Sequence, residues 1–248
     1  MSDLSEKPTD GEPRFRIIFN ALRDEITSGN LAEHAMLPSE RGVAETYTVS
    51  RMTARRALEA LETEGLAYRE GRKGRFVSPR RLTYDISQMV SFAADAKARG
   101  VNLQIDMIEA GPRDADEKLA RELSVQIGEH LHEYTRLFKI DGHAIFIETE
   151  FVIAARFPDL LRHDLRQSTT LLLDQHYNTL AHTGDVIIRM RGVSADEAKL
   201  LGLSANTAGI ELEQVISDTA GTPFCIGHQI WRGELAEFSA RTMVNPES

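Results

Sequence analysis

Apolar residues near the start of the chain recur every three or four positions, which is the spacing of a helix with one buried face. The first such run consists of Phe15, Ile18, Phe19, Leu22 and Ile26. Gly29 closes this run, as glycine often does at the end of a helix. Ser39 and Ser50 precede two further helical runs, and serine is a favoured cap at a helix start. The pattern therefore predicts three consecutive helices.

Two short segments with strand character follow the third helix. They span 66–69 and 75–78 and flank a basic turn at 70–74 that contains two glycines. Three helices and a hairpin are the elements of a winged helix-turn-helix, which we expect over residues 14–78. Residues 1–13 are polar and contain two prolines and a glycine, so we expect a disordered tail there.

The pattern changes after the basic segment, and helices begin to mix with longer strands. Segments 131–140 and 144–153 flank Asp141-Gly142, a dipeptide typical of a two-residue hairpin turn. The other expected strands are 101–107, 186–190, 210–217, 224–231 and 236–243, and the expected helices are 91–99, 116–123, 169–180 and 194–201. We therefore predict an α+β protein in which a linker, 79–90, leads to a second domain over 91–244.

The distribution of charge distinguishes the two domains. The 248 residues carry a net charge of −9, which by itself argues against binding to nucleic acid. Residues 14–81, however, hold 13 Lys and Arg against 9 Asp and Glu, a net charge of +4, whereas residues 82–248 carry −10. A basic surplus confined to the first domain is expected if only that domain contacts phosphates.

The sequence also indicates where the protein acts. No apolar run approaches the roughly 20 residues that span a bilayer, and the polar, acidic start of the chain lacks the features of a signal peptide. The single cysteine, Cys225, excludes an intrachain disulfide and fits a reducing compartment. We therefore expect a cytoplasmic protein with no membrane partner.

The third predicted helix has the residues of a DNA-reading helix. The N-terminal residues of such a helix meet base edges in the major groove, and here they are Ser50, Arg51, Thr53 and Arg55. Arginine can pair bidentately with guanine, and Arg51 and Arg55 project from one helix face. The residues placed to hold phosphates are Ser39, Arg41 and Thr53. The alternative for each arginine is that it only solvates an amphipathic helix.

These motifs resemble the DNA-binding domain of the GntR family in order and spacing. The resemblance is carried by Leu37-Pro38-Ser39-Glu40-Arg41, Val49-Ser50-Arg51, Ala57-Leu58, Leu61, Glu64-Gly65-Leu66 and Lys73-Gly74-Arg75-Phe76-Val77. It implies a homodimer that binds a short palindromic operator in double-stranded DNA, with Arg72, Lys73 and Gly74 of the wing also at the DNA. Two positions depart from the family pattern. Gly42 replaces a helix former, and Arg72 stands where the family has a glycine, which is here Gly71.

The second domain resembles the ligand-sensing domain of the HutC subfamily, the UbiC transcription regulator-associated domain, which has a chorismate-lyase-like antiparallel sheet. The matching residues are Ser91-Phe92, Ala98-Arg99-Gly100, Arg136, Asp141-Gly142, Ile147-Glu148-Thr149, Ala195-Asp196-Glu197-Ala198, Leu200-Leu201-Gly202, Gly221-Thr222-Pro223 and Trp231-Arg232-Gly233-Glu234. The resemblance implies an effector-binding and dimerisation domain that holds a small molecule against the sheet.

The same resemblance suggests which residues contact the effector. Arg136 is expected to pair with a carboxylate or phosphate, Glu148 to accept hydrogen bonds, and Ser91 and Phe92 to offer backbone N–H groups. Phe138 stands where relatives often have a second arginine. The remaining expected effector-binding residues are Cys225, where relatives often have a glutamate, and Trp231. Phe138 and Cys225 are less polar than the residues that relatives often have at these positions, which favours a compact carboxylate over a phosphosugar as the effector.

Each of these residues also has a simpler interpretation. Arg136 and Glu148 can form a plain cross-strand ion pair, Cys225 can be a small buried apolar residue rather than a redox sensor, and Trp231 can belong to the core. His130 and His132 share a strand face, but no acidic residue at suitable spacing completes a metal site. We therefore expect no metal and no cofactor.

The function predicted from the sequence is that of a ligand-responsive DNA-binding transcription regulator, a repressor released from its operator by a small anionic metabolite. An activator or an architectural DNA-binding protein is the alternative within DNA binding. A lyase-like enzyme is the alternative from another class, but no catalytic triad, nucleotide-binding loop or Cys/His cluster is present. We therefore expect no catalytic residues and no enzyme activity.

Overall fold

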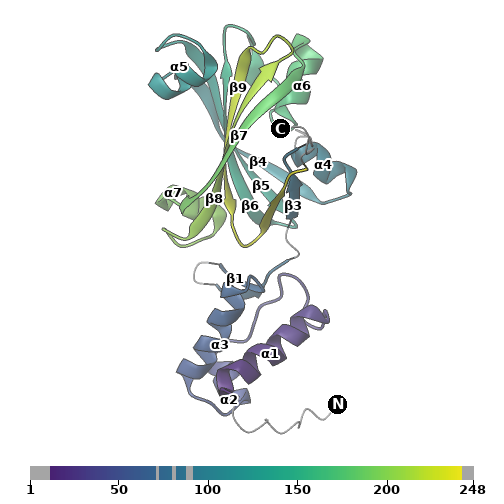
Figure 1. Ribbon diagram of the computed structural model, residues 1–248, viewed down its shortest axis with the longest axis vertical. Helices are drawn as coiled ribbons and strands as arrows, with labels where there is room; N and C mark the ends of the chain where they lie inside the picture. The colour runs from purple at the N-terminus through teal and green to yellow at the C-terminus, as the bar shows by residue number, and fades with distance from the viewer. Residues whose placement is uncertain (1–11, 71–72, 80–81, 88–91, 242–248) are drawn as a thin grey trace, which may run out of the picture. The chain divides into compact units, whose positions relative to one another are not determined.

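The computed structural model describes residues 12–70, 73–79, 82–87 and 92–241. The chain divides into two compact units, Met1–Arg81 and Leu82–Ser248, which are described separately here (Figure 1). Residues 1–11 of the predicted tail and the wing residues Gly71 and Arg72 lie outside the described residues.

The first unit contains three helices and a two-stranded antiparallel hairpin. Its elements are α1 (Arg14–Thr27), α2 (Glu40–Thr46), α3 (Arg51–Thr63), β1 (Ala67–Glu70) and β2 (Gly74–Val77). The serine caps predicted for α2 and α3 are confirmed: Ser39 Oγ accepts from the Gly42 backbone N–H and Ser50 Oγ from that of Thr53, each at 3.1 Å. The core that joins the helices and the hairpin is made of Ile18, Phe19, Leu22, Leu37, Val43, Ala44, Ala54, Ala57, Leu58, Leu61, Ala67 and Val77.

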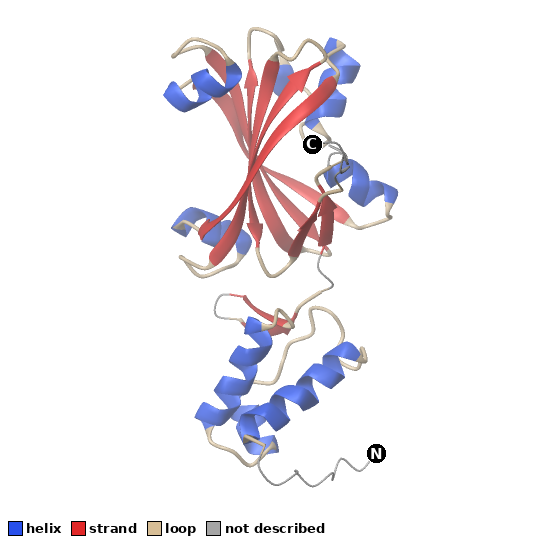
Figure 2. Ribbon diagram, viewed as in Figure 1, coloured by secondary structure: helices blue, strands red, loops and turns tan. Residues whose placement is uncertain are grey.

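The second unit is built on a six-stranded antiparallel sheet in the order β4-β5-β6-β9-β8-β7. The strands are β4 (Leu103–Asp114), β5 (His130–Ile140), β6 (His143–Ile153), β7 (Ala181–Gly192), β8 (Ala208–Asp218) and β9 (Pro223–Arg232). The helices are α4 (Phe92–Ala98), α5 (Glu117–Leu123), the 3-10 turn η1 (Leu160–Arg162), α6 (Thr169–Tyr177) and α7 (Ala195–Leu201). Figure 2 shows α5 and α7 against one face of the sheet and α4 and α6 at the other.

Alternation along the strands separates the two faces of this sheet. On β5, Leu131 packs with residues of α5 and Leu137 packs with residues of α7. The odd-numbered side chains of β5 therefore lie on the sheet face that α5 and α7 cover. Tyr134 packs with residues of α6 on the opposite face. The hairpin turn between β5 and β6 is confirmed at Asp141-Gly142. Both residues have positive φ, 49° and 81°, as the favoured two-residue turn requires.

The predicted linker, 79–90, is shorter than expected. Residues Leu82–Asp85 form strand β3, which pairs in parallel with β10 (Ala236–Ser239) near the C-terminus. Tyr84 of β3 is buried, and its ring lies 5.8 Å from that of Trp231. These residues therefore belong to the second unit, because they pair with and pack on its C-terminal part. The sequence pattern missed this because a four-residue strand whose partner lies over 150 positions away leaves no local periodic signal.

Candidate functional site

A groove on the first unit brings together residues from the start of α2, the start of α3 and the wing. It is lined by Met36, Leu37, Pro38, Ser39, Glu40, Arg41, Arg51, Lys73, Gly74 and Arg75. Five of the nine residues predicted to contact DNA are in this set, although they come from three separate stretches of sequence. Two helix N-termini with a basic wing form a surface suited to the phosphate backbone.

Four basic side chains in or beside this groove, Arg41, Arg51, Arg55 and Lys73, are exposed and only weakly engaged. Arg51 is exposed and has no ion-pair partner among the described residues. Arg41 pairs with Glu45 at 3.5 Å, Arg55 with Glu59 at 2.7 Å, and Lys73 with Glu70 at 2.6 Å. Exposed pairs of this kind contribute about 0–1 kcal/mol. These cations can therefore exchange a carboxylate for a phosphate at little cost.

A second groove runs along α3 and includes residues that the sequence analysis did not select. It is lined by Arg14, Phe15, Met52, Thr53, Arg55, Arg56 and Glu59. Met52 is 70% exposed, an unusual position for a large apolar side chain, and it lies next to Arg51 at the start of α3. Apolar side chains in a reading helix can contact the methyl group of thymine. The sequence did carry a signal for the exposure of Met52, because this residue lies outside the helix face that buries Ala54, Ala57, Leu58 and Leu61.

Arg75 is another residue that the sequence reading overlooked. It is only 9% exposed, and its guanidinium pairs with Glu40 of α2 at 3.2 Å and with Glu62 of α3. A single side chain on β2 thereby connects the wing to both helices. Arg75 has a positioning role in the groove, because it fixes the wing relative to the start of α2.

The second unit contains a small cavity between the sheet and α4 and α6, with a volume of about 40 Å³. Its lining is formed by Tyr84, Phe92, Ala93, Arg136, Phe138, Phe146, Glu148, Glu150, Gln167, Ser168, Thr169, Thr170, Gln214, Ile216 and Gln229. At ~10–15 Å³ per water molecule, this volume accommodates about three waters. The cavity is therefore small, mostly polar on one side and aromatic on the other.

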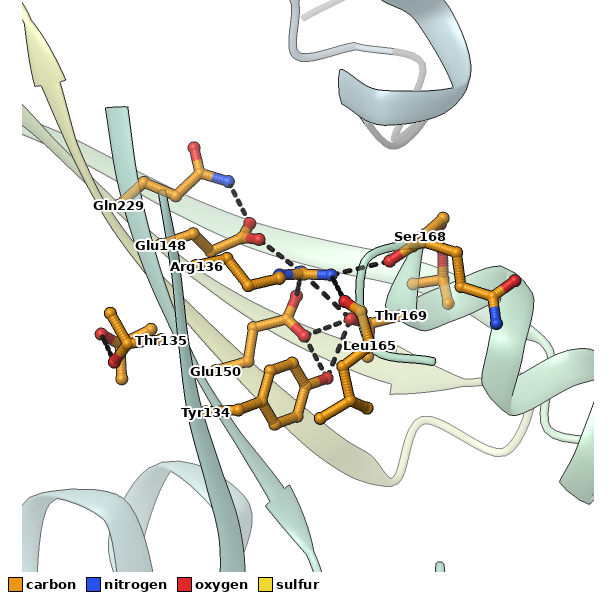
Figure 3. Close-up of polar contacts among 12 residues, drawn as sticks. Tyr134, Thr135, Arg136, Glu148, Glu150, Leu165, Ser168, Thr169 and Gln229 are labelled. Carbon is orange, nitrogen blue, oxygen red and sulfur yellow. Dashed lines mark hydrogen bonds and ion pairs between the residues drawn. The ribbon is translucent and has the colours of Figure 1, made fainter. Parts of the chain in front are cut away.

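Arg136 lies at the centre of the polar side (Figure 3). Its Nη1 donates to the backbone carbonyls of Leu165 and Gln167, each at 2.7 Å. Its Nη2 donates to Glu148 Oε2 and to Thr169 Oγ1, the latter at 3.2 Å, and lies 3.2 Å from Glu150 Oε1. Nε has no hydrogen-bond partner within the described part of the chain. Four of the five N–H donors of a guanidinium are thus engaged within the protein.

The two carboxylates beside Arg136 are held by further hydrogen bonds. Glu148 accepts at Oε1 from Gln229 Nε2 at 2.7 Å, and Gln229 in turn accepts from Trp231 Nε1 at 2.8 Å. Glu150 Oε2 accepts from the hydroxyl groups of Tyr134 and Thr169. Burial raises the pKa of Glu150, and Glu148 adds to this, against the opposing effect of Arg136.

Three predicted effector-binding residues, Phe92, Arg136 and Glu148, line this cavity, and Ser91 lies outside the described residues. Arg136 and Glu148 also form the cross-strand ion pair that was the simpler alternative. Cys225 and Trp231 do not line the cavity, so their expected direct contact with an effector is not supported.

The packing of these two residues explains why. Trp231 is fully buried in an aromatic stack, 3.9 Å from the ring of Phe146. Cys225 lies in a core cluster with residues of α6, and burial raises the pKa of its thiol well above the ordinary value. Cys225 is therefore a small buried apolar residue. Glu150, by contrast, was missed, although it follows Glu148 by two positions on one strand and therefore had to share its face.

In the part of the chain that the structure describes, no group of three or more His, Cys, Asp or Glu side chains is arranged to hold a metal ion. His130 instead contacts Asp114 at 2.7 Å, and His132 contacts the carbonyl of Phe157 at 3.0 Å. Among the described helices, none combines the length and apolar character needed to cross a membrane.

A winged helix-turn-helix joined to a sheet domain with a small polar cavity defines a DNA-binding regulator with a separate sensor domain. The comparisons with known proteins agree. Residues 16–77 match the model described as bacterial regulatory proteins, gntR family, and residues 98–237 match the UTRA domain. The chain belongs to the gntR family of bacterial regulators and carries a UTRA domain.

The chain is similar to known transcription regulators over most of its length and of theirs. The chain is 26% identical over 226 residues to the HTH-type transcriptional repressor NagR of Bacillus subtilis, covering 91% of this chain and 93% of that protein. It is 30% identical over 204 residues to the HTH-type transcriptional repressor PhnF of Mycolicibacterium smegmatis, covering 82% of each. The crystal structure of PhnF from Mycobacterium smegmatis aligns with a TM-score of 0.65 at 25% identity, covering 92% of this chain and all of that one.

Proposed function

We propose that this protein is a cytoplasmic repressor that binds a palindromic operator and leaves it when a small molecule enters the cavity of the UTRA domain. The observation that carries the proposal is the pairing of two sites in one chain. One is the basic groove formed by α2, α3 and the wing. The other is the small polar cavity of the second unit. The names of NagR and PhnF, both transcriptional repressors, support repression as the mode of action.

In this proposal α3 enters the major groove with its N-terminal end. Arg51 reads a guanine, because it is exposed and free of a competing carboxylate among the described residues. Arg55 assists after release from Glu59, and Ser50 and Thr53 complete the contacts of the helix start. The residues assigned to the phosphates and the wing contact are Ser39, Arg41, Arg72, Lys73 and Gly74.

The proposal includes a homodimer, since a palindromic operator is read by two copies. Strand β7 supports this, because it is an edge of the sheet and exposes large apolar side chains. Ile187 is 56% exposed, Ile188 41% and Met190 73%. An exposed apolar edge strand normally pairs with another chain or is protected from doing so. A second copy of the same chain is the occupant that operator symmetry requires.

The covalent connection between the two units offers a way for ligand binding in the cavity to affect the DNA-binding unit. Tyr84 lines the cavity, and it lies on β3, the first strand after the boundary between the two units. A ligand that displaces Tyr84 therefore moves the segment through which the two units are covalently joined. We propose that this movement changes the spacing of the two recognition helices in the dimer and so weakens operator binding.

The test compares operator affinity in two arginine variants of the full chain. Arg51→Ala should lose specific affinity by roughly 5- to 150-fold, the equivalent of about 1–3 kcal/mol for one bidentate guanine contact. Arg23→Ala is the matched control, because Arg23 lies on α1 outside both grooves and pairs with Asp24. Fluorescence anisotropy with a selected operator duplex measures both. Equal affinities in the two variants would show that α3 does not read the DNA.

A further inference from the structure

The charges that line the effector cavity do not balance. Arg136 supplies one positive charge, while Glu148 and Glu150 supply two negative charges. The other lining residues that the structure describes are neutral. All three charged residues are between 3% and 5% exposed, so water screens them poorly. The cavity therefore carries a surplus negative charge when both carboxyl groups are ionised.

Arg136 has little capacity left for an anionic ligand. Its Nη1 and Nη2 groups already donate to two backbone carbonyls, to Glu148 and to Thr169. Among the residues that the structure describes, the Nε–H alone finds no hydrogen-bond partner. A bidentate clamp on a carboxylate or phosphate needs two parallel N–H groups, and a single N–H does not provide it. An anion in this cavity would also lie beside two carboxylates that repel it.

The carboxylates, by contrast, retain capacity to accept hydrogen bonds. An ionised carboxylate offers about four acceptor positions. Glu148 accepts one bond at each oxygen, from Arg136 and from Gln229. Glu150 accepts two bonds at Oε2 from Tyr134 and Thr169, while its Oε1 is engaged by the charge of Arg136 at 3.2 Å. A donor with a positive charge is therefore the group that this side of the cavity can still bind.

The part of the cavity lining next to these charged residues is aromatic. Tyr84, Phe92, Phe138 and Phe146 line it, and Phe92 stands edge-on to Phe146 with 5.1 Å between ring centres. Phe138 and Phe146 pair directly across β5 and β6, two residues along each strand from the Arg136–Glu148 pair and therefore on the same face of the sheet. Aromatic rings accept apolar groups and also attract cations. The cavity thus joins acidic acceptors to an apolar wall.

We propose that the effector of this protein is a compact organic cation, an amine whose N–H groups bind Glu148 and Glu150 while its carbon part packs on Phe138 and Phe146. This inference rests on the proposed function, because it assigns a ligand class to the same cavity. It replaces the carboxylate or phosphate expected from the sequence. The volume of about 40 Å³ restricts the ligand to a few non-hydrogen atoms unless the walls move.

The experiment uses three probes with one carbon skeleton: isobutylamine, isobutanol and isobutyrate. Each is added at millimolar concentration to the full-length protein, and the melting temperature and operator affinity are measured. The amine should raise the melting temperature and weaken operator binding, and isobutyrate should do neither. A response to isobutyrate equal to or larger than that to the amine overturns the proposal, and so does the absence of any response to the amine.

Two variants locate the binding. Glu150→Gln and Glu148→Gln, each keeping a hydrogen-bonding side chain of the same size, should reduce amine affinity by roughly 10- to 100-fold, the effect of losing a hydrogen bond to a charged group. Glu109→Gln is the matched control, because Glu109 is an exposed residue on β4 outside the cavity. Operator affinity without ligand is measured for every variant. If the wild-type chain binds its operator but does not respond to the amine, the assignment of the ligand class is wrong and the proposed function stands. If the wild-type chain binds no operator, the proposed function is wrong.

Discussion

Replacement of Arg136 by methionine tests the account of the buried charges in the second unit. Arg136 is 3% exposed, and it is the only cation that lines the cavity among the described residues. Methionine fills a similar length without charge. The replacement leaves Glu148 and Glu150 buried side by side with no counter-ion, and it releases the carbonyls of Leu165 and Gln167 from their hydrogen bonds.

The size of the effect follows from this arrangement. Removing one partner of a buried ion pair costs about 3–5 kcal/mol, because the remaining charge is uncompensated. For a domain of about 150–250 residues, each kcal/mol lowers the melting temperature by roughly 2–4 °C, so the expected fall is roughly 6–20 °C. Glu150→Gln should instead stay within about 1 kcal/mol of the wild type. It removes the surplus charge and keeps an acceptor for Tyr134 and Thr169.

Tryptophan fluorescence in a urea titration measures the unfolding of this unit alone. Trp231 is the single tryptophan of the chain, and it is fully buried in the second unit. The deficit of Arg136→Met should also shrink at acidic pH, because the two carboxyl groups then take up protons. A loss below about 1 kcal/mol for Arg136→Met, together with a larger loss for Glu150→Gln, would show that the charge accounting is wrong.

Four further predictions concern separate parts of the second unit. The pKa of Glu150 is raised, so the folded state binds the proton of this carboxyl group more tightly than the unfolded state does. The stability that Glu150 contributes should therefore fall as the pH rises from about 4.5 through the raised pKa. The difference in unfolding free energy between the wild type and Glu150→Gln across this pH range measures the effect. Ser194→Ala removes the capping box of α7 and should cost about 0.5–2 kcal/mol in the same urea assay. Cys225 should fail to react with a thiol reagent in the folded protein and react fully in urea; prompt labelling in buffer would place it outside the core. Replacing Ile188 and Met190 together by lysine should convert the proposed dimer to a folded monomer in sedimentation analysis, whereas a dimer that persists in this variant would exclude β7 as the interface.

Much of the first unit could be predicted from the sequence because its signals are local. Ser50 caps α3 through a backbone N–H three residues away, and the buried face of the helix repeats every three or four residues. What the sequence did not show is the role of Arg75. Its pairs with Glu40 and Glu62 join elements that lie 35 and 13 positions away, and such contacts produce no periodic pattern.

The second unit shows where sequence reasoning stops. The β5–β6 hairpin was predicted because Asp141-Gly142 specifies its turn. The turn alone would place Arg136 opposite Ile147, and a register shift between Phe138 and Lys139 brings Arg136 opposite Glu148 instead. Strand β7 was predicted over only five residues, since its edge position leaves most of its side chains exposed and weakens the alternation. The charge of the cavity depends on Glu150 and on the carbonyls that occupy Arg136. The resemblance to relatives identifies Arg136 as a single position. It does not show that the N–H donors of Arg136 are already bound to other groups of the protein.

In vitro selection from random double-stranded DNA with the full-length protein is the most direct test of the central claim. The account predicts enrichment of a short inverted repeat, with a guanine at equivalent positions of both half-sites where Arg51 makes its contact. The same selection with Arg51→Ala should lose that guanine preference. Recovery of no common sequence, or of an unrepeated site that the Arg51→Ala variant selects equally well, would contradict the claim that this protein is a dimeric operator-binding regulator.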